Sequence, residues 1–386
     1  MPEVSQQRDL RLDFFRGLAL VLIFVDHIPE NFLSYFTLQT VGFYDAAEVF
    51  IFISGFTAAL VYGRRLSAKG VLYTVAQVWR RAWQLYVAHI FLFVIFIAEV
   101  SYTVIAFNNP MYNEEMRVGD FLDEPHIAIV KAMLLQFQPT FLDILPLYIV
   151  MLLIFPAVLI GLRRSVPAVV AASLLTYLAV QVLGISVAAY PAGHVWYFNP
   201  LAWQFLFVAG AALGHFAMRA GGIPRGVLRA IYPAAVAVFG IALAIKLSWT
   251  AHGIWDWFPG LLLKELWPVN KNNLSPLRLV PFFALVAIVA LRVPHQAGWL
   301  QSAAARPLVL CGQQSLEVFC LGILLSALGH FVLAEYDTGL LTQIGVNAVG
   351  IAVMFLTAAL IDWYKAMDRR PLAPAAERRL ADDGAR

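Results

Sequence analysis

The sequence is poor in charge and in cysteine. Only 13% of its 386 residues are charged, whereas a soluble domain carries about a quarter. It contains two cysteines, Cys311 and Cys320. On one helix they would point to opposite faces, because nine steps of about 100° end half a turn out of phase. A disulfide between them is therefore not expected, and neither is an ordinary soluble domain.

Several common chemistries also lack their motifs. The sequence has no Walker-type phosphate loop, no clustered Cys/His metal site and no Gly-Xaa-Ser-Xaa-Gly nucleophile elbow. These motifs serve phosphate binding, metal chemistry and serine hydrolysis. A nucleic-acid signature is lacking as well, so neither a bound metal nor a nucleic-acid partner is expected.

Apolar residues in long runs are abundant. Hydrophobic residues make up 61% of the chain, and a transmembrane helix needs about 20 of them in succession. The predicted spans cover residues 12–28, 43–62, 82–107, 139–161, 166–189, 197–218, 227–248, 279–293, 308–333 and 340–363. The expected fold is therefore all-α, a polytopic transmembrane bundle of about ten helices.

Basic residues are distributed unevenly between these spans. If the N-terminus is cytoplasmic, 21 of the 27 Lys and Arg lie in inner segments or at inner span ends. Lys246 lies in a span, and the outer loops hold Arg117, Lys131, Lys264, Lys271 and Arg278. Because cytoplasmic loops carry an excess of Lys and Arg, this pattern predicts that both termini are cytoplasmic. One membrane domain is expected over residues 1–367, followed by a polar, disordered cytoplasmic tail, 368–386.

The first span, FFRGLALVLIFVDHIP, carries Arg16 at one end and Asp26-His27 at the other. Arg16 and His27 lie on one helix face, because eleven steps of about 100° complete three turns plus about 20°. The stripe thus joins an inner guanidinium to an outer imidazole. Ionisable residues inside spans are costly and usually line a site or a pathway. Arg16 as a plain anchor and Asp26-His27 as a helix end among headgroups remain open.

The second span opens at the same outer level with GFYDAAEVFIFISGF. Asp45 and Glu48 share a face and are expected at the depth of His27. A carboxylate beside the imidazole would orient it and raise its basicity, as a general base requires. The alternative is a capped helix start in water. Gly55 would allow close helix approach or leave room for a ligand.

Other polar residues are predicted to flank this pair of spans. Arg80 and Arg81 open the third span, either as topology signals or as ligands for a phosphate-bearing molecule. Gln313 and Glu317 are predicted to share a face of the ninth span, either joining helices or lining a cavity. Outer tryptophans form an interfacial belt or a carbohydrate surface. The candidate substrate-binding residues are Trp196, Asn199, Gln204, Arg278, Glu317 and His330.

The sequence resembles a known family at several of these places. Arg16 followed after ten residues by His27, Phe-Ile-Ser-Gly-Phe around Ser54, and Arg80-Arg81 before a third helix are similar to the type-3 membrane acyltransferase superfamily. More specifically, RLDFFRGLALVLIFVDHIPENF, GFYDAAEVFIFISGF, WYFNPLAWQFLFVAG and QQSLEVFCLGILLSALGH resemble the OpgC family. These stretches span most of the chain, and their combination is specific.

The resemblance implies an inner-membrane succinyltransferase that decorates osmoregulated periplasmic glucans. Succinyl-CoA would be the cytoplasmic donor, with no permanently bound cofactor, and a glucose hydroxyl would be the acceptor at a site open toward the periplasm. Arg16 and His27 are carried over as functional. The expected catalytic set is His27, Glu48, Asp45 and Asp26, with Arg16, Arg80 and Arg81 holding the donor. A covalent acyl-histidine is the variant mechanism, and a homo-oligomer is left open.

Other functions remain compatible with the residues. An O-acetyltransferase acting on another envelope polysaccharide would use the same groups. A proton-coupled transporter or flippase could use the same buried histidine and carboxylates and would show flux without acylation. A non-catalytic scaffold for glucan synthesis accounts least well for the intramembrane charges.

Overall fold

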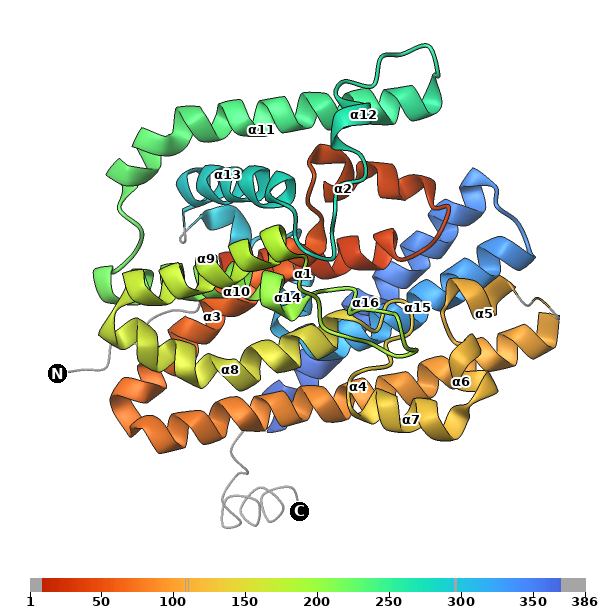
Figure 1. The fold of residues 1–386 in the computed structure, drawn as a ribbon, viewed down its shortest axis with the longest axis horizontal. Coiled ribbons are helices and arrows are strands. Elements are labelled where there is room, and N and C mark those ends of the chain that lie inside the picture. The colour runs from red at the N-terminus through yellow and green to blue at the C-terminus, as the bar shows by residue number, and fades with distance from the viewer. Residues whose placement is uncertain (1–8, 108, 110, 295–296, 369–386) are drawn as a thin grey trace, which may run out of the picture.

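The computed structural model describes residues 9–107, 109, 111–294 and 297–368. The predicted tail, apart from Asp368, lies outside these residues. Over the described part of the chain, the structure is built from helices, and β pairing is limited to an isolated bridge between Ala188 and Val195. The predicted all-α class is thus confirmed (Figure 1).

A long helix lies at each predicted span. These helices are α1 Leu10–Asp26, α3 Ala46–Lys69, α4 Val71–Phe107, α8 Ile144–Arg164, α9 Val166–Leu183, α10 Pro200–Ala220, α11 Arg225–Ile254, α13 Pro276–Arg292, α15 Ser315–Glu335 and α16 Leu340–Asp368. Eight of them are long and apolar enough to cross a membrane. The other two, α1 and α13, have 17 residues each. A polytopic helical bundle is therefore the architecture.

Short helices connect the long ones. They are η1 Phe32–Phe36, α2 Leu38–Val41, α5 Met111–Glu115, α6 Gly119–Asp123, α7 Pro125–Met133, α12 Leu263–Leu266, η2 Gly298–Gln301 and α14 Arg306–Gln313. Half of them, α5, α6, α7 and α12, lie in the two long connections that follow α4 and α11. The first of these connections, through α5, α6 and α7, folds over one end of the bundle and helps to enclose the site.

Two predicted boundaries are wrong. The third helix starts at Val71 rather than at residue 82, so Arg80 and Arg81 lie inside α4 instead of opening it. The ninth span is divided at Gln314 into α14 and α15. Gln314 is buried, and its side-chain oxygen accepts a hydrogen bond of 2.6 Å from Lys365. Because the helix is interrupted, Gln313 and Glu317 do not share a continuous helix face.

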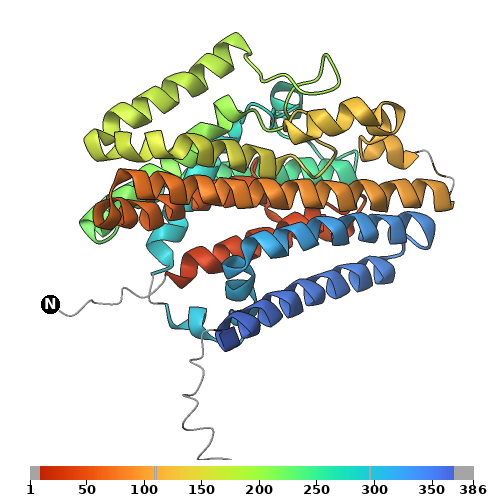
Figure 2. The ribbon, with the colours of Figure 1, turned by 90° about the horizontal axis from the view of Figure 1, so that it is seen from below.

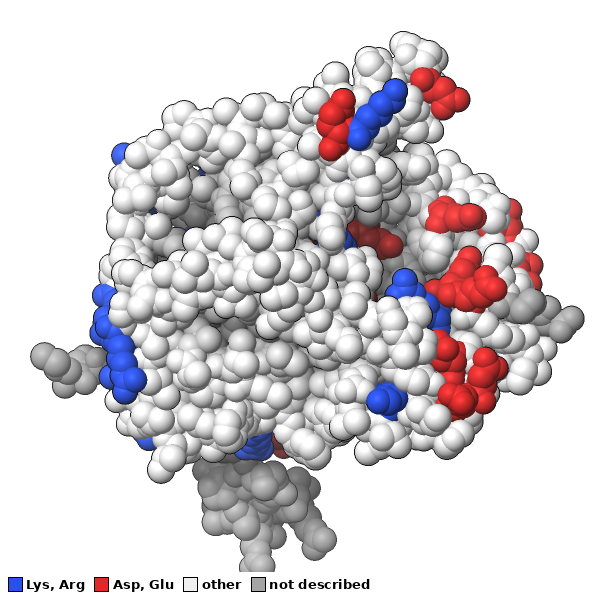
Figure 3. Space-filling view, in the orientation of Figure 1, with Lys and Arg blue, Asp and Glu red and all other residues white. Residues whose placement is uncertain are grey.

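The long helices run alternately in opposite directions, so charge separates between the two ends. The helices α3, α8, α10, α13 and α16 finish together, and their last turns carry Lys69, Arg163, Arg164, Arg219, Arg292 and Lys365. We call this the basic end. The opposite, acidic end carries Glu114, Glu115, Asp120, Asp123 and Glu124 in the segment that contains α5, α6 and α7. In Figure 3 most Asp and Glu lie toward one end, and the opposite edge carries Lys and Arg without acids, while a few Lys and Arg also lie among the acids.

Glycines bring two pairs of helices into backbone contact at the core. A methyl group at Gly55 on α3 would overlap the carbonyl oxygen of Phe207 on α10. The same holds at Gly17 on α1 against Leu308, and at Gly312 on α14 against Asp13. The close approach predicted at Gly55 is confirmed, since small residues let backbones touch. These contacts fix α1 and α3 at the centre, while α4, α9 and α16 lie along the outside (Figure 2).

Candidate active site

A cavity of about 640 Å³ lies at the acidic end, where α1 finishes and α3 begins. We call it the acidic-end cavity. Its lining comes from five parts of the chain: the α1–α3 hairpin, the segment 113–144, the loop 189–198 and the single residues Lys271 and Phe319. Asp26, His27 and Asp45 all line it. The sequence-predicted meeting of the first two spans around one site therefore occurs.

His27 caps the end of α1, and its contacts define its tautomer. Its ring Nδ1 lies 2.5 Å from the carbonyl oxygen of Ile23, which also accepts the backbone N–H of His27 at 3.0 Å. A carbonyl oxygen can only accept, so Nδ1 carries the proton and Nε2 keeps its lone pair. A neutral imidazole with a basic Nε2 is the form that a general base requires.

The ring of Phe141 packs edge-on against the His27 ring, with 4.7 Å between the ring centroids. Phe141 has a φ of 74°, a left-handed conformation that costs a bulky residue on the order of 1–3 kcal/mol. The preceding residue, Thr140, is tied to α5 because its hydroxyl donates to the Glu115 carbonyl and its amide to that of Met116. The surrounding structure thus holds a strained loop against the imidazole.

The two predicted carboxylates start α3 and bind cations. Asp45 accepts the Ala47 amide at 2.9 Å, and Glu48 accepts the Asp45 amide at 3.0 Å, which is a capping box. Arg278 then joins both, with Nε 2.5 Å from Glu48 and Nη2 3.1 Å from Asp45. The pair is therefore a capped helix start, but not one in water, because Glu48 is fully buried. The ring hydrogen bond found for His27 goes to the Ile23 carbonyl, not to these carboxylates.

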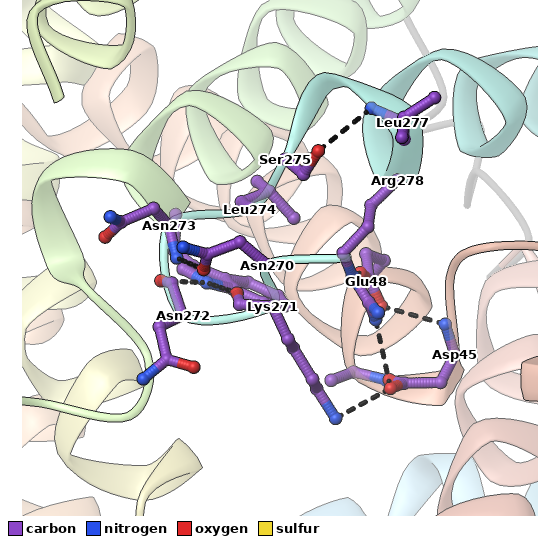
Figure 4. Close-up of polar contacts among 12 residues, drawn as sticks. Asp45, Glu48, Asn270, Lys271, Asn272, Asn273, Leu274, Ser275, Leu277 and Arg278 are labelled. Atoms are coloured by element: carbon purple, nitrogen blue, oxygen red, sulfur yellow. Dashed lines mark hydrogen bonds and ion pairs between the residues drawn. The ribbon is translucent and has the colours of Figure 1, made fainter. Parts of the chain in front are cut away.

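Lys271 brings a second cation to the cluster and extends into the cavity (Figure 4). Its Nζ lies 2.6 Å from Asp45 and stands over the rings of Tyr197 and Phe198. Burial alone would lower the pKa of this ammonium, but the Asp45 carboxylate raises the pKa above its ordinary value. Lys271 therefore stays charged over the whole physiological range.

The loop that carries Lys271 is fixed by hydrogen bonds to neighbouring helices. The Trp203 indole donates to the carbonyls of Lys271 and Asn272, both at 3.2 Å. Tyr177 and Gln181 on α9 donate to the carbonyls of Leu274 and Asn273. The loop also closes on itself, since the Ser275 amide donates to the Asn270 carbonyl (Figure 4).

Sequence reasoning counted Lys271 only as an outer-loop charge and missed its place in the site. The available signal was the polar run Asn-Lys-Asn-Asn inside an otherwise apolar and aromatic connection. Such a run before Ser275, which caps α13, is typical of a tightly turned loop.

Carboxylates and aromatic rings dominate the rest of the cavity lining. The acids other than Asp45 are Asp26, Glu114, Asp120, Asp123 and Asp143, and the rings include Phe141, Tyr190 and Tyr197. Burial raises the pKa of Asp143, just before α8, to about 6. Carboxylates accept hydrogen bonds from hydroxyl groups, and flat rings can pack on sugar faces. The lining therefore suits a neutral, hydroxyl-rich molecule.

None of the six predicted substrate-binding residues lines this cavity. Asn199 caps α10 and donates to the Ile185 carbonyl and to Asn273, whereas Gln204 binds Ser173 on α9. His330 pairs with Glu115 at 2.7 Å. The remaining three are Trp196, which is buried, Arg278, which holds Asp45 and Glu48, and Glu317, which lies 3.6 Å from Lys365 at the basic end. Their contacts support helix packing around the site.

A second void, of about 1560 Å³, lies among α1, α3, α10 and α13. We call it the basic-end groove. Its walls are mostly apolar, and Arg11, Arg64 and Arg225 lie at its basic end. Arg16 does not line it but donates to the Thr57 hydroxyl at 2.8 Å, and Thr57 does. The other predicted donor ligands, Arg80 and Arg81, line neither void.

The two voids approach each other in the middle of the molecule. On α1, Leu22 lines the groove and Ile23 the cavity, and on α2 the same holds for Leu38 and Gln39. At the start of α3, the corresponding residues are Val49 and Ala47. Neighbouring residues thus face opposite voids, so α1, α2 and the start of α3 form the partition between them.

These features define a class: a multi-pass helical membrane protein with a histidine site at one end and an arginine-rimmed apolar groove at the other. The model of the OpgC protein family matches residues 8–366. The chain therefore belongs to the OpgC family, as its motifs predict. A comparison with curated proteins found no match. Family membership indicates a membrane acyltransferase role in glucan modification.

Proposed function

We propose that the protein is an O-succinyltransferase of the bacterial inner membrane. It moves a succinyl group from cytoplasmic succinyl-CoA to glucose hydroxyls of osmoregulated periplasmic glucans, with the basic end in the cytoplasm. The observation that carries this proposal is His27, whose Nδ1 is bound to the Ile23 carbonyl while the residue lines the acidic-end cavity. Family membership supports the acyl transfer, and the separation of charge between the ends supports the orientation.

The chemistry needs one base and two aligned substrates. The glucan hydroxyl oxygen attacks the thioester carbon while His27 Nε2 takes the hydroxyl proton. The C–S bond then breaks, and the imidazolium returns the proton to the CoA thiolate. Asp26, which accepts a hydrogen bond from Gln39 at 3.3 Å and lines the cavity, is placed to accept from the sugar. Attack by Nε2 itself, to give an acyl-histidine, is the variant of the same step.

Asp45 and Glu48 influence this step without a hydrogen bond to the His27 ring. Their bonds to Arg278 and Lys271 hold the start of α3 beside the end of α1. Asp45 also lines the cavity, where its charge favours a protonated imidazole and the charge of its partner Lys271 opposes one. We therefore assign them positioning and electrostatic roles in place of a direct triad contact.

The donor arm enters through the basic-end groove. Arg11, Arg64 and Arg225 meet the phosphates of CoA at the mouth, and the apolar walls take the pantetheine arm. Along α1, the sixteen steps from Arg11 to His27 span about 24 Å at 1.5 Å per residue. Arg16 supports the wall through Thr57, while Arg80 and Arg81 can reach only those parts of CoA that stay outside the groove.

Two voids that approach from opposite ends also suit a proton-coupled transporter or flippase, so this is the second candidate. The deciding experiment uses sealed proteoliposomes with a neutral glucan on one side and radiolabelled succinyl-CoA on the other. We expect label in the glucan and a product mass raised by one succinyl group, without passage of intact CoA. Flux without acylation would overturn the enzyme, and an acetylated product only with acetyl-CoA would favour the acetyltransferase.

A further inference from the structure

The ionisable residues of the acidic-end cavity are mostly acids. Six carboxylates line it, from Asp26, Asp45, Glu114, Asp120, Asp123 and Asp143, against the two cations Arg117 and Lys271. A neutral sugar or a neutral acyl group meets no repulsion there. An acyl group with its own carboxylate meets like charge from several of these acids, which is unfavourable at low dielectric. Such a group needs a cation at a fixed place.

Lys271 is the better-placed of the two cations. Arg117 is exposed, whereas Lys271 is fixed by the bonds from Trp203 and by the neighbouring loop bonds. A fixed Lys271 is not needed to neutralise Asp45, because Arg278 already binds that carboxylate at 3.1 Å. An ammonium has three N–H donors. One of those on Lys271 is directed to Asp45, which leaves donors for a ligand in the cavity.

The direction from which the donor enters brings its acyl chain into the cavity that Lys271 lines. If the pantetheine arm comes from the groove and the thioester stops at His27, the acyl chain beyond the carbonyl continues into the acidic-end cavity. His27 and Lys271 both line that cavity. A carboxylate at the far end of a short acyl chain would therefore arrive among these groups.

We propose that Lys271 recognises the free carboxylate of the transferred acyl group and so makes the site selective for a dicarboxylic donor. This inference rests on the proposed acyl transfer and names the residue that sets its substrate class. Lys271 forms and breaks no covalent bond. The bond changes stay at the thioester carbon, the sugar oxygen and the CoA sulfur.

The test compares three donors with the purified full-length protein and a neutral glucan oligosaccharide. The donors are succinyl-CoA, its methyl ester, which has the same length without the charge, and acetyl-CoA. The variants are Lys271→Met, Lys271→Arg and the charge-matched double variant Asp45→Asn/Lys271→Met. For each, kcat/KM is measured for every donor and the product is weighed by mass spectrometry. Gel filtration and a thermal melt check folding.

In Lys271→Met and in the double variant, we expect the ratio of kcat/KM for succinyl-CoA over the methyl ester to fall about 10- to 100-fold, the value of one charge-assisted hydrogen bond. Lys271→Arg should restore most of that ratio. An equal loss with charged and neutral donors would overturn the inference, because Lys271 would then serve the reaction centre or the fold. A wild-type protein that transfers acetyl but not succinyl would also overturn it. Failure of the proposed acyl transfer itself would appear differently, as no acylation by the wild type from any donor.

Discussion

The acidic-end cavity and the basic-end groove are two voids of opposite chemistry inside one bundle. The cavity is about 640 Å³ and is lined by carboxylates, rings and His27, whereas the groove is about 1560 Å³ and is apolar with arginines at its mouth. A hydroxyl-rich sugar suits the first, and an anionic molecule with a long arm suits the second. The difference supports the proposal that two unlike substrates approach the same partition from opposite ends.

The largest effect is expected at the cavity side of the partition. His27→Gln keeps a polar side chain but removes the base, so glucan acylation should fall about 10²- to 10⁴-fold. The assay is initial rate in proteoliposomes, after gel filtration and protease protection show normal folding and insertion. Donor binding in the groove should persist. An unchanged rate in a well-folded His27→Gln protein would remove the proposed mechanism.

The second-largest effect is expected at the partition between the two voids. Val49→Trp fills the groove where it approaches the cavity, and because small misplacements of reacting groups are costly, acylation should fall about 10²-fold. Val49→Ala is the matched control and should keep the passage open. CoA binding, measured by calorimetry, should survive in both variants. Normal acylation by Val49→Trp would mean that the acyl arm takes another route.

A smaller effect is expected at the mouth of the groove. Arg64→Ala removes one cation that lines the groove, so KM for succinyl-CoA should rise about tenfold while KM for the glucan stays unchanged. Arg65→Ala is the control, because Arg65 is adjacent on α3 but packs on Tyr62 outside the groove. Arg81→Ala tests the alternative clamp on α4. If Arg81→Ala raised KM for succinyl-CoA and Arg64→Ala did not, the donor would bind beside α4.

The smallest effect concerns the stability of the cavity wall. Burial raises the pKa of Asp143 to about 6, so near neutral pH the folded state holds a charged carboxylate that water would solvate better. Asp143→Asn should therefore stabilise the protein by about 1–3 kcal/mol at pH 7.5. The gain should shrink as the pH falls through 6 toward 4, where the native carboxyl is already protonated. Melting temperatures of both proteins across that range check this. A gain that did not depend on pH would contradict the assigned cause.

Hydropathy and helix geometry predicted much of this fold, because lipid imposes a simple length rule on each span. They also predicted that His27 and Asp45 would meet, since a hairpin of adjacent spans fixes their common depth. The division of the ninth span at Gln314, where the side chain binds Lys365 of α16, was not predictable, because no local residue pattern marks it. The partners of Glu48 were missed for the same reason. Arg278 lies 230 residues further along the chain, and no local pattern reports such a pairing.

The backbone contact between α1 and α14 bears on how the protein is made. Gly17 and Gly312 are 312 − 17 = 295 positions apart, yet each helix is shaped to fit the other. The ribosome releases α1 first, so this helix must wait in the bilayer, with Asp13 and Arg16 already inserted, until α14 emerges. Helix α1, which His27 caps, can take up its final packing only then.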